Sequence, residues 1–227
     1  MNTRGTTATY SYDALGRISQ ITETGGVVKQ YGYNIANNVT SFTVDVNNVR
    51  QMNTAYGYDN MGRLTTVSEN NVLQATYSYD INGNRASLTN ANGTSVAYQY
   101  NRANWVTNLT NYSGNAITSS YAYSYYADGN QRTKTDHNNK VTTYFYDDLG
   151  RLTSENENGA FIISYLYDLN SNRKSMTVSG SESYVTTYSY DSNNRLTSET
   201  KTEGSTREIT NYFSTLTAIN TAKHVRR

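Results

Sequence analysis

The chain has 227 residues, and its 19 Lys and Arg residues almost balance its 18 Asp and Glu residues. A partner held through its phosphates requires a basic face, so this balance predicts no nucleic-acid partner. The sequence has no run of about 18 apolar residues, so we expect no membrane span. The polar N-terminus lacks the apolar segment of a signal peptide, so either the chain is not exported by that route or it is a piece of a longer protein.

The composition favours a β protein with a thin core. Cysteine is absent, which excludes disulfides, thiolate metal sites and a thiol nucleophile. Proline is absent as well, as expected for many paired strands, because proline removes a ladder hydrogen bond. The chain contains 23 Tyr residues, and tyrosine is typical of half-buried strands.

A Tyr-x-Tyr motif, usually followed by Asp, recurs along the whole chain at intervals of 21 to 25 residues. The nine copies begin at Tyr10, Tyr31, Tyr56, Tyr77, Tyr98, Tyr123, Tyr144, Tyr165 and Tyr188. Such a period indicates a repeat architecture, in which each copy is one supersecondary unit that stacks on its neighbours.

The copy that begins at Tyr56 shows how each repeat is built. Tyr56 and Tyr58 alternate with smaller residues, which places both tyrosines on one face of a strand. Residues 59–62 read Asp-Asn-Met-Gly and predict a type I turn, with Gly62 adopting the positive φ that follows it. Residues 63–69 form the second strand, and Asn70-Asn71 turns the chain back.

The second turn recurs in every copy as a pair of residues that tolerate positive φ in a two-residue hairpin loop. The pairs are Gly25-Gly26, Asn47-Asn48, Asn70-Asn71, Asn92-Gly93, Gly114-Asn115, Asn138-Asn139, Asn158-Gly159, Gly180-Ser181 and Gly204-Ser205. Nine copies therefore predict on the order of 18 antiparallel strands in a sheet that must coil, curl or close.

Two kinds of copy alternate. The copies at Tyr10, Tyr56, Tyr144 and Tyr188 read like YDALGRI, whereas those at Tyr77 and Tyr165 read YDINGNR and YDLNSNR, with one more residue before Arg. The physical unit is then a pair of repeats, and the two turns would differ in twist.

The motifs YDALGRI, YDNMGRL, YDINGNR, YDDLGRL and YDSNNRL resemble the YD-repeat (Rhs-repeat) family of Rhs toxins, insecticidal toxin complexes and teneurins. The resemblance covers residues 6–213 and implies tandem β-hairpins wound into a large spiralling sheet, either a partial shell or an open barrel-like solenoid. It implies a secreted or cell-surface location, and as partners the remainder of a larger shell or an enclosed toxin domain. The proline-rich core motif of Rhs shells is missing, so no self-cleaving aspartates are expected. We assign residues 1–213 to nine repeats and residues 214–227 to a polar tail.

Several charged residues could carry chemistry, and each has a structural alternative. One turn carboxylate per repeat could bind calcium, but Asp at this turn position usually accepts bonds from turn amides, and each loop offers only about one ligand. These carboxylates are Asp13, Asp59, Asp80, Asp147, Asp168 and Asp191.

The other acids and the histidines show no catalytic spacing. Asp147-Asp148 and the pair Glu155 and Glu157 could serve glycoside chemistry, but they fit exposed positions better. The two histidines, His137 and His224, have no ligand or triad spacing.

Arginines that follow the turns form a periodic set: Arg17, Arg63, Arg85, Arg151, Arg173 and Arg195. They could read anionic sugars or phosphate, or they could stack on Tyr rings and pair with the turn Asp, which we favour. The tyrosine rows could bind sugar rings or form the thin core, and again we favour the structural role.

Trp105 breaks the pattern because it replaces the Arg that follows the turn in its copy. We expect a ligand surface, if the chain has one, at Trp105 and Arg102, although Trp105 could instead fill a packing irregularity.

The sequence as a whole predicts a non-enzymatic structural protein without cofactor or metal, a segment of an Rhs-type shell around a cargo. The alternative is a free-standing adhesion module that binds glycans through a Tyr and Arg surface. The strand of residues 6–12 contains no charged residue, so we also expect self-association through strand edges.

Overall fold

The computed structural model describes residues 7–213 and 221–225, which form β-strands and no helix. The predicted all-β architecture with antiparallel neighbours is therefore confirmed. Within these residues, nothing provides a helix long and apolar enough to cross a membrane. The chain divides into two compact units, residues 1–120 and 121–227, which are described separately.

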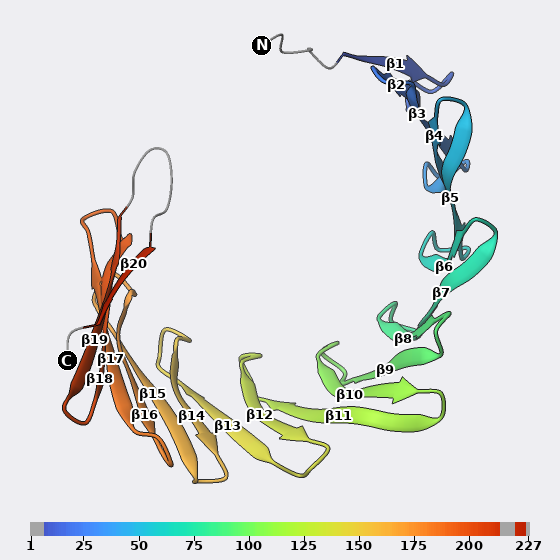
Figure 1. The fold of residues 1–227 in the computed structure, drawn as a ribbon. Coiled ribbons are helices and arrows are strands. Elements are labelled where there is room, and N and C mark those ends of the chain that lie inside the picture. Colours follow the sequence, from blue (N-terminus) through green and yellow to red (C-terminus); the bar gives the residue numbers. More distant parts are fainter. Residues whose placement is uncertain (1–6, 214–220, 226–227) are drawn as a thin grey trace, which may run out of the picture. The chain divides into compact units, whose positions relative to one another are not determined.

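The first unit is a meander in which each strand pairs antiparallel with the next along the chain. Colours change steadily from strand to strand through this single layer (Figure 1). Its strands are β1 (Ala8–Tyr12), β2 (Ile18–Glu23), β3 (Val27–Tyr33), β4 (Val39–Val46), β5 (Val49–Tyr58), β6 (Leu64–Glu69), β7 (Val72–Tyr79), β8 (Arg85–Asn90), β9 (Thr94–Tyr100) and β10 (Val106–Ser113).

The second unit is a meander of the same kind. It begins within β11 (Ala116–Tyr125), whose residues from Tyr121 onward pair with β12. The following strands are β12 (Gln131–Asp136), β13 (Val141–Tyr146), β14 (Leu152–Glu157), β15 (Phe161–Tyr167), β16 (Arg173–Ser179), β17 (Tyr184–Tyr190), β18 (Leu196–Glu203), β19 (Thr206–Tyr212) and β20 (Thr221–Val225).

The two kinds of turn lie at opposite edges of each sheet, because antiparallel strands in a meander reverse alternately at the two ends. We call the edge with the Asp-type turns the turn edge and the other the hairpin edge. At the hairpin edge, Val46 pairs with Val49, and Asn47 and Asn48 between them have φ of 50° and 63°. Two positive φ values define the type I′ loop that the Asn-Asn pair predicts.

At the turn edge, every Asp-type turn has the same backbone. In the first, the N–H of Gly16 donates to the carbonyl of Asp13 at 3.0 Å, as in a type I turn, and Gly16 has φ of 76°. Ser11 then pairs with Gln20 and Tyr12 with Ile18, so Ser19 is the extra residue of a β-bulge. Positive φ recurs at the fourth turn position in all nine copies: Gly16, Asn37, Gly62, Gly83, Asn104, Gly129, Gly150, Ser171 and Asn194.

The two kinds of copy differ in side chains and not in turn length. Asp80 donates its N–H to the carbonyl of Asn84, as Asp13 does to the carbonyl of Arg17. Asn84 therefore occupies the place of Arg17, and Arg85 already belongs to the next strand. The expectation of an inserted residue and a different turn was wrong, because the sequence spacing alone does not show where the turn ends.

The core is as thin as the composition indicates. In the first unit no described residue is buried, and in the second only a few are, among them Val178 and Tyr165 at 2% and 8% exposure. Two local features were not expected. Strand β20 lies in the segment assigned to the tail and pairs with β19, and the hairpin-edge loop at Asp136 adopts the hydrogen bonds of an Asp-type turn.

Candidate functional site

The repeated carboxylate closes its own turn. Oδ1 of Asp13 accepts the backbone N–H groups of Leu15 at 2.9 Å and Arg17 at 3.0 Å. Oδ2 of Asp13 accepts a bond from Nε of Arg17 at 2.7 Å. The Arg17 side chain, followed by its backbone N–H, lowers the pKa of Asp13 because both bind the charged carboxylate. The same bonds recur at Asp59, Asp147 and Asp191.

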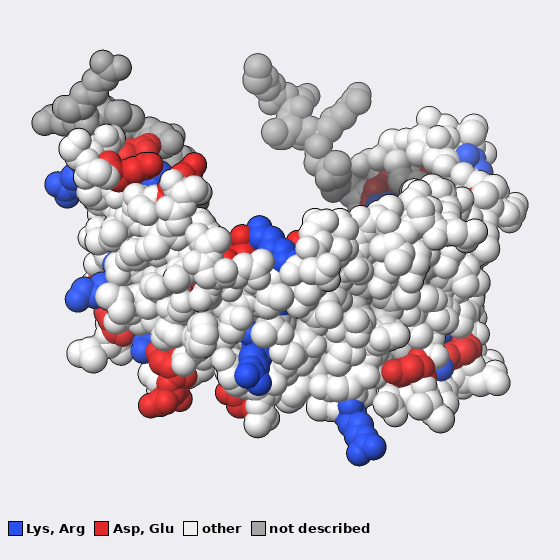
Figure 2. All heavy atoms as spheres, turned by 90° about the horizontal axis from the view of Figure 1, so that it is seen from below, with Lys and Arg blue, Asp and Glu red and all other residues white. Residues whose placement is uncertain are grey.

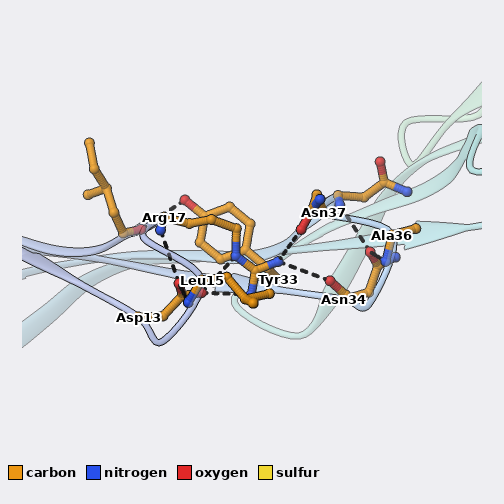
Figure 3. A network of polar contacts seen from close by, with 9 residues as sticks. Asp13, Leu15, Arg17, Tyr33, Asn34, Ala36 and Asn37 are labelled. Carbon is orange, nitrogen blue, oxygen red and sulfur yellow. Dashed lines mark hydrogen bonds and ion pairs between the residues drawn. The ribbon is translucent and has the colours of Figure 1, made fainter.

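The arginine of the turn also reaches the next copy, as Figure 3 shows for Arg17. Its Nη1 donates to the carbonyl of Asn34 at 3.2 Å and to Oδ1 of Asn37 at 2.7 Å. Its guanidinium carbon lies 4.4 Å from the centre of the Tyr33 ring, a cation–π contact. Arg63 stacks in the same way on Tyr79, and Arg151 on Tyr167. The expected stacking and pairing of these arginines is thus observed.

The second tyrosine of the motif joins most copies to the one before it. The hydroxyl of Tyr33 donates to the carbonyl of Ile18 at 2.8 Å, and that of Tyr79 donates to the carbonyl of Leu64 at 2.7 Å. In each case the acceptor is the residue that follows the turn of the preceding copy. Equivalent bonds come from Tyr58, Tyr100, Tyr167 and Tyr190. These tyrosines therefore have a structural role.

Copies that lack glycine at the fourth turn position carry a side-chain oxygen that accepts a bond from the preceding copy. Oδ1 of Asn104 accepts a bond from Asn84, and Oδ1 of Asn194 accepts one from Asn172. Oδ1 of Asn37 and Oγ of Ser171 accept bonds from the preceding arginines in the same way. At the fourth turn position, a bond between copies thus accompanies each left-handed residue that is not glycine, a conformation that otherwise disfavours side chains.

Arg85 and Arg173 do not belong to the same set as the other four arginines. Because they lie one residue beyond the turn, they contact the first tyrosine of their own copy: Arg85 lies 5.4 Å from the ring centre of Tyr77, and Arg173 lies 4.8 Å from that of Tyr165. The single periodic column inferred from the sequence is therefore two columns.

Trp105 and Arg102 lie in the fifth turn of the first unit. The backbone N–H of Trp105 donates to Oδ1 of Asn101 at 3.0 Å, which places Trp105 at the position that Arg17 holds in its own turn. Trp105 is half-buried, whereas Arg102 is exposed at the second position of the turn. Nothing in this arrangement tests whether the two residues bind a ligand.

Glu155 and Glu157 each have a local partner. The hydroxyl of Tyr165 donates to Glu155 at 2.6 Å, and Lys140 pairs with Glu157 at 2.6 Å. Burial, and then the carboxylate of Glu155, raise the pKa of the Tyr165 phenol. Across the described ranges, no three His, Cys, Asp or Glu residues gather as a metal site would require. His137 is exposed, and the His224 side chain lies outside the described residues.

The second unit has an open hollow that the sequence did not indicate. Its volume is about 610 Å³, and it lies along the turn edge of the last three copies. Tyr167, Tyr188 and Tyr190 supply aromatic walls, and amides, carboxylates and Lys174 supply polar groups. Each lining residue also fits an ordinary place in the repeat, and therefore no motif marks this hollow.

Charge is evenly distributed on the surface in view. The face in Figure 2 carries basic and acidic side chains in small separate groups with uncharged surface between them. This distribution agrees with the balance of 19 basic and 18 acidic residues.

A sheet of hairpins with Asp-capped turns along one edge, and with Arg and Tyr contacts between copies, defines a tandem YD-repeat protein. Residues 30–224 match the family model Teneurin YD-shell, and residues 1–28 match the model RHS Repeat. The chain belongs to the Teneurin YD-shell family. No curated protein sequence matches it.

Solved structures of Tc toxin components have a similar fold. The TcdB2-TccC3-Cdc42 crystal structure matches with a TM-score of 0.65 and 15% identity, covering 95% of this chain and 15% of that chain. A mutant Tc holotoxin pore from Photorhabdus luminescens matches with a TM-score of 0.66 and 15% identity, with the same coverage. TcdB2-TccC3 without its hypervariable C-terminal region matches with a TM-score of 0.55 and 13% identity, covering 95% of this chain and 16% of that chain. This chain therefore spans a small part of these proteins, and the likeness concerns the fold.

Proposed function

We propose that the chain is a non-enzymatic structural segment of a YD-repeat shell that encloses a cargo. The observation that carries the proposal is the contact between successive copies, in which an arginine, an amide or a tyrosine hydroxyl of one copy bonds to a neighbouring copy. Side chains that hold copies together are what a wall requires. Membership of the YD-shell family and the Tc toxin neighbours support the same role, with a secreted or surface location.

The absence of catalytic chemistry belongs to this proposal as well. The repeated turn carboxylates are bound to turn amides and to the arginine or asparagine side chain that ends the turn, and Glu155 and Glu157 have hydroxyl and ammonium partners. A general base or nucleophile requires a free lone pair directed at a substrate. These acids have their lone pairs directed at the sheet itself.

The first experiment is the intact mass of the native product in its source cells and medium, followed by limited proteolysis. If the chain is a wall segment, we expect a species much larger than 25.4 kDa. Part of its sequence outside the YD repeats should resist protease and become sensitive when the YD sheet is unfolded. A native product of 25.4 kDa that protects no other sequence would contradict the enclosure of a cargo.

The hollow of the second unit favours a second candidate function, binding of glycans at a cell surface. Tyrosine rings beside amides and carboxylates can stack on a sugar ring and bind its hydroxyls. The test is a glycan array with the wild-type chain and the Tyr188→Ala variant. Tyr56→Ala is the matched control, because Tyr56 has the same place in its repeat but lies outside the hollow. Loss of binding in both variants, or in neither, would contradict a site in the hollow.

A further inference from the structure

The turn edge of the first unit carries a row of exposed aliphatic side chains. Leu15, Ile35, Met61 and Ile81 are 71%, 103%, 77% and 99% exposed, one in each of the first four turns. Turn tips usually carry polar residues, and the turn itself does not require an aliphatic residue at the tip of each of these four turns. The second unit shows the same feature on its own turns, at Leu149 and Leu169.

The turns hold these side chains outward. Leu15 and Met61 are at the third turn position, where their N–H groups are bound by the carboxylates of Asp13 and Asp59 at 2.9 Å. Ile35 and Ile81 are at the second position of the alternate copies. Because the backbone is fixed by these bonds, the side chains cannot fold back onto the sheet.

Neighbouring turns also contact one another, so the tips form one row. Arg17 bonds to the second turn through Asn34 and Asn37, and Asn84 bonds to the fifth through Asn104. Two strands separate successive tips, which places them roughly 10 Å apart. The row ends at the fifth turn, where the small Ala103 occupies the third turn position and the exposed Arg102 the second.

We propose that this row docks on the same row of a second copy of the chain, turn edge against turn edge. A partner must present apolar groups with the same spacing of roughly 10 Å, and an identical edge in a twofold arrangement does so automatically. The tips of the hairpin edge are Asn and Gly residues, and its exposed Val49, Val72 and Ile117 lie on the strands beside the loops and not at the tips. This inference does not depend on whether the sheet encloses a cargo.

Most of the charge at the tips is neutralised within the turns. Asp13 and Asp59 each form an ion pair of 2.7 Å with the arginine of their own turn. Asp80, beside Ile81, is bound by the Asn84 amide at 3.0 Å and keeps its negative charge, so two such edges meet with one charged turn each.

The predicted contact is small. Four tips cover a strip about 30 Å long and about 10 Å wide, or roughly 300 Å² per partner, whereas a stable interface needs about 800 Å² per partner. We therefore expect weak, concentration-dependent association of this chain, which grows stronger as more turns are added to the row.

The absence of cysteine allows a direct test in the full chain. Ile35→Cys places a thiol in the row, and Asn115→Cys places one on the exposed hairpin edge of the same unit as the control. Under mild oxidation we expect disulfide-linked dimers of the Ile35→Cys chain to form faster as concentration rises, and faster than those of the control. Adding Leu15→Asn, Met61→Asn and Ile81→Asn to the Ile35→Cys chain should remove this difference.

Sedimentation velocity of the cysteine-free chain gives a second measurement. We expect the average mass to rise at high concentration, and we expect no such rise for the variant with Leu15→Asn, Met61→Asn and Ile81→Asn. Circular dichroism shows whether that variant is folded, since its substitutions lie in solvent. Equal dimer formation by Ile35→Cys and the control, or dimer formation unchanged by the three Asn substitutions, would overturn the proposal.

Discussion

Replacing Tyr79 with phenylalanine removes one hydrogen bond between two copies and leaves the aromatic ring in place. The hydroxyl donates to the carbonyl of Leu64 at 2.7 Å, while the guanidinium of Arg63 lies 4.5 Å from the ring centre. A neutral hydrogen bond contributes about 0.5–1.5 kcal/mol net to stability. We expect Tyr79→Phe to lower the free energy of unfolding by about 1 kcal/mol, roughly a fivefold change in the unfolding equilibrium.

Tyr79→Leu removes the ring as well, and the lost cation–π contact should cost about 0.5–1 kcal/mol more. The assay is urea unfolding followed by far-UV circular dichroism, with amide exchange in β6 and β7 to localise the change. Exchange is required because repeat proteins can unfold in parts, and a single global transition then has no clear meaning.

Tyr12→Phe is the matched control. Tyr12 has the same place in the first copy, but no preceding copy lies beside it in the described residues, and its hydroxyl has no bond there. We expect no change in stability for this variant. Equal losses for Tyr12→Phe and Tyr79→Phe would refute the reasoning, because the recurrence of tyrosine could then not be attributed to bonds between copies.

Three other predictions follow from the turns and the sheet edge. The pKa of folded Asp59 is lowered, first by the backbone N–H of Arg63, which binds the charged carboxylate. The ionised carboxylate therefore stabilises the fold above the unfolded pKa of 3.8, and this stabilisation is lost as the pH falls through the folded pKa. In urea unfolding at a series of pH values, Asp59→Asn should reduce the loss of stability at low pH. Asn71 has φ of 66°, so Asn71→Val should cost about 1–2 kcal/mol in urea unfolding, whereas Asn71→Gly should not destabilise the chain. Strand β1 is exposed along its length, so Thr9→Lys should reduce strand-edge aggregation measured by light scattering; unchanged scattering would count against a role for this edge.

Most of the fold could be predicted because the local signals agree with one another. The alternation of Tyr56 and Tyr58, the Asp and Gly of the turn and the Asn-Asn hairpins all indicate the same strand–turn–strand unit. Each signal acts through a few neighbouring residues, so it is visible in the sequence without knowledge of the rest of the chain.

The contacts between copies were only partly accessible. Stacking of arginine on tyrosine was inferred correctly, but Arg85 was placed in one column with Arg17, because residue spacing does not show that the turn ends at Asn84, one residue before Arg85. The aliphatic tips were missed for a different reason. Leu15 in a turn motif looks like any other residue at a permissive position, and only its exposure in the structure shows that nothing in the described sheet covers it.

The alternation of arginine and asparagine at the last turn position has a consequence for how such a chain can change its length. Arg17 reaches an acceptor on the following turn and Asn84 does the same in the alternate copy, so each kind of copy is fitted to the other. Duplication of a pair of copies preserves every one of these junctions, whereas loss or gain of a single internal copy creates a mismatched one. Sheets of this design should therefore lengthen and shorten in steps of two repeats, and the pair is the unit in which an engineer should extend them.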